Sequence, residues 1–154
     1  MKKCVEENAD IPVLFFCGLD DTSEGEGFDR ENISLSAEQI KLYREIRSVT
    51  KNIILVTFGS FPFDLSFALE KNCEARAILH MYLCGEACAR ACAMLLSGKK
   101  NPSGKLAETW PLENAYLKPD EEYDINYREG VLVGYRYNGV TALEQPEETW
   151  LMFS

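Results

Sequence analysis

Residues 53–58 read IILVTF, an uncharged run that the turn-forming residues 59–62, GSFP, bring to an end. The run is short for a helix and rich in β-branched side chains, so it predicts a strand buried on both of its faces. Residues 11–17, IPVLFFC, have the same character and predict the same kind of strand. Residues 76–83, RAILHMYL, predict a third strand, so the sequence indicates a sheet covered by other elements.

Two helices are predicted around these strands. Ser36 and Gln39 have the spacing of a capping box, in which the serine caps the helix and the glutamine side chain reaches back to it. Apolar residues recur at helical spacing behind them. Residues 85–98, GEACARACAMLLSG, predict a second helix that Gly85 opens and Gly98 ends. The alternation predicts an α/β sandwich, a mostly parallel sheet flanked by helices in flavodoxin-like layering.

The sequence beyond residue 98 is rich in turn-forming residues. It offers short strands at 106–110 and at 130–137, GVLVGYRY, whereas residues 111–128 show no periodicity. The final stretch, TALEQPEETWLMFS, ends in apolar residues for which this prediction has no partner element. We therefore expect the chain to be cut there rather than finished.

Size and charge narrow the classes of function. The 154 residues suit one domain, and the net charge of −9 opposes binding to the phosphates of nucleic acids. No apolar run reaches the length of about 18–20 residues that a membrane-spanning helix needs. Acidic residues interrupt the N-terminal apolar stretch, so we expect no secretion signal and a cytoplasmic location.

The six cysteines form no Cys-x-x-Cys pair, and the chain has a single histidine. We therefore expect free buried thiols and no metal site. Cys84, Cys88 and Cys92 would share one face of the second helix, where a metal ladder or the packing of small residues could explain them. We favour packing. His80 is expected to be a core histidine. No phosphate-binding glycine pattern is present, and we expect no cofactor.

The segment SEGEGFDR, residues 23–30, follows the first predicted strand. Ligands of parallel sheets gather at the carboxyl ends of the strands, so this segment is placed where chemistry is common. Its glycines would let the loop project Glu24 or Glu26 as a general acid, and Arg30 could pair with Asp29 at the loop base. An ordinary acidic surface turn would have the same composition, so the residues alone leave both possibilities open.

Four motifs in order resemble glycoside hydrolase family 3, in particular the second, α/β-sandwich domain of its bacterial β-glucosidases. They are GLDDTSEGEGFDRENISLSAEQ, NIILVTFGSFPFDLSF, AILHMYLCGEACARACAMLLSGKKNPSGKLAETWP and YREGVLVGYRY. The resemblance begins near residue 11, and it implies that residues 1–138 are part of such a domain, incomplete relative to the full family domain. Residues 139–154 form a tail that departs from the family pattern.

The resemblance implies a retaining enzyme that removes terminal β-linked sugars. In this family an aspartate nucleophile lies on a preceding (β/α)8 barrel, which is absent from this chain and would act in cis or in trans. The acid/base is the glutamate that opens the Glu-Gly-aromatic-Asp-Arg motif, here Glu26, with Glu24 as the competitor. Asp29 and Arg30 would support the loop. The isolated chain is expected to have little or no activity.

The resemblance implies that the subsite that selects the sugar and the linkage belongs mainly to the barrel. A non-catalytic α/β module that binds a carbohydrate or a protein is the alternative function. Apolar surface that a barrel would cover could also lead to self-association.

Overall fold

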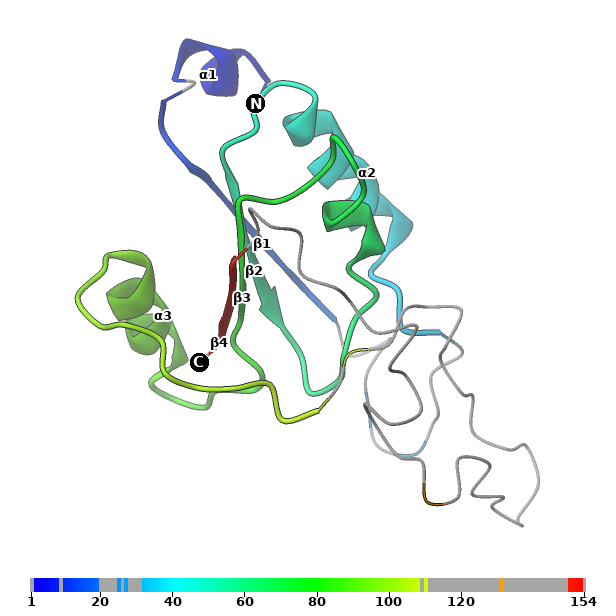
Figure 1. The fold of residues 1–154 in the computed structure, drawn as a ribbon, viewed down its shortest axis with the longest axis vertical. Coiled ribbons are helices and arrows are strands. Elements are labelled where there is room, and N and C mark those ends of the chain that lie inside the picture. The colour runs from blue at the N-terminus through cyan, green and yellow to red at the C-terminus, as the bar shows by residue number, and fades with distance from the viewer. Residues whose placement is uncertain are drawn as a thin grey trace.

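A computed structural model describes part of the chain: residues 2–8, 10–19, 25, 27, 32–108, 110, 131 and 150–153. Its centre is a sheet of four parallel strands in the order β1–β2–β3–β4 (Figure 1). The strands are β1 (Val13–Gly18), β2 (Ile53–Phe58), β3 (Ala77–His80) and β4 (Trp150–Phe153). The parallel α/β fold predicted from the sequence is therefore confirmed.

Helices of the described part lie on both faces of this sheet, and α1 lies beyond the end at which β1 begins (Figure 1). They are α1 (Lys2–Glu7), α2 (Ala37–Arg47) and α3 (Cys88–Leu96), with a short 3-10 turn, η1 (Ser66–Ala68). α2 and α3 occupy opposite sides of the sheet, which is the predicted layering. α1 is an element that the sequence patterns did not indicate. No helix in the described ranges is both long and apolar enough to cross a membrane.

Alternation along the strands divides the core into two parts. Phe15, Leu55 and Ile78 are paired in register and belong to the larger core, which contains the buried residues Tyr43 and Ile46 of α2. Residues one position further along, including Val56 and Leu79, belong to the smaller core with Cys92 of α3. Because successive side chains of a strand point to opposite faces, β2 and β3 contribute to both parts of the core.

The prediction that the first strand is buried on both faces is wrong for β1. Leu14 is 41% exposed and Phe16 is 53% exposed, although Phe15 between them is buried. β1 is one of the two edge strands of the described sheet, and a groove of about 710 Å³ lies between its outer face and α3. Apolar runs of this kind cannot distinguish a central strand from an edge strand, because both look equally apolar in sequence.

Several element boundaries also differ from the predictions. α3 begins at Cys88 rather than Gly85, whereas Gly98 follows the helix at a φ of +72°, as expected for the residue that ends it. The described residues of 106–110 form no strand. The final apolar residues do have a partner, because Trp150–Phe153 pairs with β3. The stretches predicted at 111–128 and 130–137 lie outside the described residues, apart from Val131.

Candidate active site

The candidate loop begins where β1 ends, at the carboxyl edge of the parallel sheet. Gly18 is the last residue of β1 and is paired with Phe58, the last residue of β2. The predicted site residues, Glu24 and Glu26 with the supporting residues Asp29 and Arg30, lie outside the described part of the chain. Their roles therefore stay predictions. Gly27, next to Glu26, has a φ of +96°, a backbone conformation that glycine adopts readily.

The entrance to the loop is fixed by a close approach and a hydrogen bond. A Cβ atom added to Gly18 would lie 2.5 Å from the carbonyl oxygen of Phe58, so a larger residue does not fit there. The side-chain Nε2 of Gln39 donates a hydrogen bond of 3.0 Å to the carbonyl oxygen of Gly18. β1 and the first turn of α2 are therefore joined directly at the point where the loop leaves the sheet.

The capping box prediction is confirmed for Ser36 and wrong for the Gln39 side chain. Ser36 is the N-cap of α2, and its hydroxyl oxygen accepts a hydrogen bond of 3.2 Å from the backbone N–H of Gln39. The reciprocal contact differs from the expectation, because the Gln39 side chain bonds to Gly18 in the sheet instead. The reason lies in the tertiary structure, which places a strand-end carbonyl within reach of the amide.

The exit from the loop is held by apolar burial. Ile33 and Leu35 precede α2, and their side chains are buried. The backbone N–H of Asp64 donates a hydrogen bond of 2.9 Å to the carbonyl oxygen of Ile33. The carboxylate of Asp64 accepts hydrogen bonds from the backbone N–H and the hydroxyl of Ser66. These contacts hold the residues just before α2 against the segment that follows β2.

A row of buried side chains crosses the sheet near the same edge. Cys17, Thr57 and His80 are paired in register across β1, β2 and β3, and all three are buried. The hydroxyl oxygen of Thr57 lies 2.8 Å from Nδ1 of His80, within hydrogen-bonding distance. Burial lowers the pKa of His80 to about 4 and raises the pKa of Cys17 to about 12. Both groups are neutral near pH 7, and the prediction of a core histidine is confirmed.

Aromatic rings enclose His80. Tyr82, Trp110 and Phe63 meet it edge-on, at ring centroid distances of 4.1, 4.7 and 5.6 Å. The hydroxyl of Tyr82 accepts a hydrogen bond of 2.9 Å from the backbone N–H of Ala107. These contacts attach the turn-rich segment before Trp110 to the strand ends. This cluster is not predicted from the sequence, because its contacts join residues from three separate parts of the chain.

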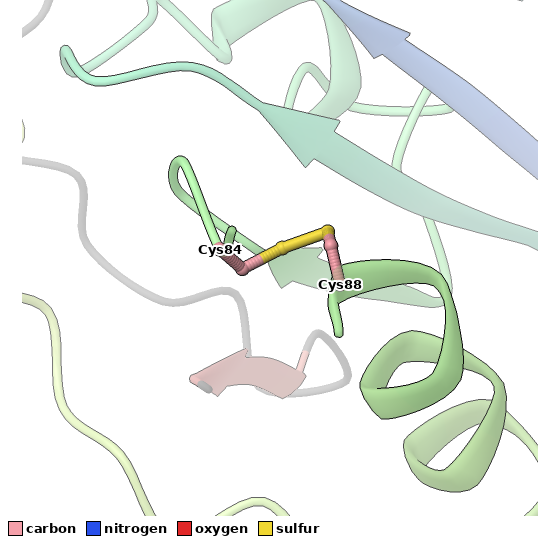
Figure 2. The surroundings of a disulfide bond; sticks show 2 residues. All are labelled: Cys84 and Cys88. Atoms are coloured by element: carbon pink, nitrogen blue, oxygen red, sulfur yellow. A yellow bond between two sulfur atoms is a disulfide. The ribbon is translucent and has the colours of Figure 1, made fainter. Parts of the chain in front are cut away.

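The prediction that all six cysteines are free is wrong for two of them. The structure joins Cys84 and Cys88 in a disulfide, with Cα atoms 4.9 Å apart (Figure 2). This pairing is possible because Cys84 lies before α3 instead of on it. The preference for packing over a metal ladder is supported, since Cys92 is buried and the pair packs against its cluster. The described residues contain no group of three or more His, Cys, Asp and Glu side chains suited to a metal ion.

The disulfide leads to a prediction about the thiol count. Without reductant, the denatured 154-residue chain is expected to react with a thiol reagent at four positions, the free cysteines Cys4, Cys17, Cys73 and Cys92. After reduction it is expected to react at all six cysteines. Peptide mass spectrometry should find Cys84 linked to Cys88. Six reactive thiols before reduction, in chain purified without reductant, would contradict the disulfide.

The class of protein follows from this geometry: an α/β sandwich domain in which an acidic, glycine-containing segment of the sequence follows the carboxyl end of β1. Residues 3–135 match the family model described as the glycosyl hydrolase family 3 C-terminal domain. The chain belongs to this family. It is 37% identical over 147 residues to thermostable beta-glucosidase B of Acetivibrio thermocellus, a match that covers 92% of this chain and 19% of that protein.

Other relatives agree with this assignment. The chain is 37% identical over 136 residues to an exo-alpha-(1->6)-L-arabinopyranosidase of Bifidobacterium breve, covering 85% of this chain and 17% of that one. A crystal structure of a Kluyveromyces marxianus beta-glucosidase aligns with a TM-score of 0.76 at 26% identity, covering 90% and 17% of the two chains. A beta-glucosidase of Bifidobacterium adolescentis aligns with a TM-score of 0.69 at 32% identity, covering 89% and 21%. The chain thus spans about a fifth of these relatives.

Proposed function

We propose that this chain is the acid/base domain of a retaining β-glycosidase, with Glu26 as the proton donor to terminal β-linked sugars. The observation that carries the proposal is the position of the Glu-Gly-Phe-Asp-Arg motif. In the sequence the motif stands between the end of β1 and the start of α2, which a hydrogen bond joins at the carboxyl edge of a parallel sheet, in a chain of family 3. Loops at this edge commonly carry chemistry in α/β proteins.

The reaction requires a second carboxylate from outside this loop. A retaining glycosidase places two carboxyl groups about 5–5.5 Å apart, on opposite sides of the bond that is cleaved. One protonates the leaving oxygen while the other attacks the anomeric carbon. Glu24 and Glu26 are separated by one residue on a single loop, an arrangement poorly suited to flanking a sugar. The nucleophile would therefore come from a (β/α)8 barrel, in cis or in trans.

The choice of substrate rests on the relatives. One is a beta-glucosidase, another is an arabinopyranosidase, and a Kluyveromyces marxianus beta-glucosidase is known in complex with glucose. The last aligns with a TM-score of 0.73 at 28% identity. A terminal β-glucoside is therefore the substrate to test first.

The proposed placement of the two catalytic carboxylates on different domains leads to a prediction. The isolated 154-residue chain is expected to release no chromophore from a 4-nitrophenyl β-glucoside, because it would lack the nucleophile. A longer protein that joins this chain to a family 3 barrel is expected to hydrolyse the substrate. The same protein carrying Glu26→Gln serves as the matched control for contaminating activity. Robust hydrolysis by the isolated chain that Glu26→Gln lowers would contradict the proposal, because the chain would then hold both catalytic carboxylates.

A further inference from the structure

The Cys84–Cys88 disulfide lies in the turn that leads from β3 into α3 (Figure 2). Cys88 is the first residue of α3, and the bond closes a short ring that spans residues 84–88. The residues between the two cysteines, Gly85, Glu86 and Ala87, are all exposed. The disulfide therefore belongs to a surface turn that small reagents in solution can reach.

The effect of this disulfide on the fold is mainly local. A short ring restricts the unfolded chain less than a disulfide that closes a long loop. The N-cap residue of α3, Ala87, makes no side-chain hydrogen bond to the helix. The disulfide and a hydrogen bond of 3.2 Å from the backbone N–H of Cys88 to the carbonyl oxygen of Gly85 tie the first turn to the preceding residues. The disulfide thus stands where other helices have a side-chain cap.

The rest of α3 is held by packing that does not depend on the disulfide. Cys92 is only 4% exposed and belongs to the smaller core with Val56 and Leu79 of the sheet. Leu95 and Leu96 pack against the same core. Breaking the bond between the two sulfur atoms would therefore release the first turn of α3 and leave the remainder of the helix in place.

The buried thiols do not compete with this pair. Thiol–disulfide exchange requires a thiolate as the attacking group. Burial raises the pKa of the Cys17 thiol to about 12 and also raises the pKa of the Cys92 thiol. Cys92 lies one helical turn beyond Cys88, but it is buried and protonated near pH 7. Exchange at this end of the molecule is therefore confined to Cys84 and Cys88.

We propose that Cys84 and Cys88 form a redox-active pair, a thiol–disulfide exchange site that a small dithiol opens and a small-molecule disulfide closes while the fold persists. This role is separate from the proposed glycosidase function and does not depend on it. Cys88 also lines the groove between β1 and α3. Opening the pair therefore loosens one wall of that groove.

The reduction proceeds through a mixed disulfide. A thiolate of the dithiol attacks Sγ of Cys84, the S–S bond breaks, and the sulfur of Cys88 leaves as a thiolate at the N-terminus of α3, where the helix dipole favours negative charge. The second thiolate of the dithiol then displaces the Cys84 sulfur. The pair gains two electrons and takes up two protons, and the dithiol becomes a cyclic disulfide. Oxidised glutathione reverses the change and leaves as two molecules of glutathione.

The test treats the folded 154-residue chain with dithiothreitol in the absence of denaturant and then labels thiols with iodoacetamide. Peptide mass spectrometry is expected to find the label on Cys84 and Cys88 and none on the buried Cys17 and Cys92. Oxidised glutathione should restore the disulfide in a reduced sample that has not been labelled.

Hydrogen exchange measures the local effect of the same reduction. Loss of a helix cap changes the opening equilibrium by about 5- to 30-fold, and amide exchange in the first turn of α3 should rise by a factor of this size. Exchange in β2 should stay as it is in the oxidised chain.

Three variants complete the test. Cys88→Ser removes the disulfide, and the first turn of α3 should exchange fast both with and without dithiothreitol. Cys84→Ser is expected to give the same result, and it tests the proposal separately if Cys88→Ser does not fold. Cys4→Ser removes an exposed free thiol on α1 and should keep the response of the parent chain.

Several results would overturn the proposal. A disulfide that resists dithiothreitol until denaturant is added would be a purely structural bond. Labelling of Cys92 together with the pair would mean that α3 unfolds as a whole. An unchanged exchange rate in α3 would mean that the disulfide does not hold its first turn. Failure of oxidised glutathione to restore the bond in the folded chain would mean that the pair is no exchange site.

Discussion

Replacing Glu26 by glutamine in the joined protein is expected to lower kcat/KM for an alkyl β-glucoside by about 100- to 10,000-fold. The amide cannot donate the proton that the leaving oxygen needs. For a 2,4-dinitrophenyl glucoside, kcat/KM should change little, because that leaving group requires no proton. The kcat for this substrate should still fall, because the same residue acts as the base in the second step and the glycosyl-enzyme would accumulate. Steady-state kinetics with both substrates measure these effects.

Glu24→Gln is the matched control, because it makes the same chemical change two residues away on the same loop. It is expected to leave kcat/KM for both the alkyl and the dinitrophenyl glucoside close to the values of the parent protein. A Glu26→Ala variant adds a second readout, since a small anion such as azide could take the place of the base-activated water and restore turnover. If kcat/KM for the alkyl glucoside falls selectively with Glu24→Gln and not with Glu26→Gln, Glu24 is the proton donor.

The second large effect concerns the dependence of stability on pH. Burial holds the pKa of His80 at about 4, below its ordinary value of 6.5. Above pH 6.5 the histidine is neutral in both the folded and the unfolded chain. As the pH falls from 6.5 toward 4, the unfolded chain takes up a proton that the folded chain resists. The free energy of unfolding should therefore fall by up to about 3 kcal/mol over this range.

This prediction can be isolated because His80 is the only histidine of the chain. Urea unfolding between pH 7.5 and 4.5 would compare the 154-residue chain with His80→Gln, which carries no titrating group at this position. The carboxylates contribute similarly to both proteins, so the difference in stability should shift against the parent as the pH falls. An NMR titration of the imidazole would give its pKa directly, and a value near 6.5 would contradict the prediction.

Local patterns in the sequence identified most of the elements. The apolar run of β2 and the Ser36 cap of α2 lie where they were expected, because strand formation and helix capping depend on neighbouring residues. The family of the chain was also evident from ordered motifs. The errors fall at places where the outcome depends on distant residues, such as the exposed side of β1 and the pairing of Trp150–Phe153 with β3.

The candidate site divides in the same way. Motif and order alone point to Glu26 and to its place after the first strand, since the covalent chain dictates which residue follows which element. The hydrogen bond from Gln39 to Gly18, the enclosure of His80 by aromatic rings and the Cys84–Cys88 pair follow only from the folded chain. These contacts join groups whose approach is set by the packing of the helices on the sheet, and no local pattern of residues encodes that approach.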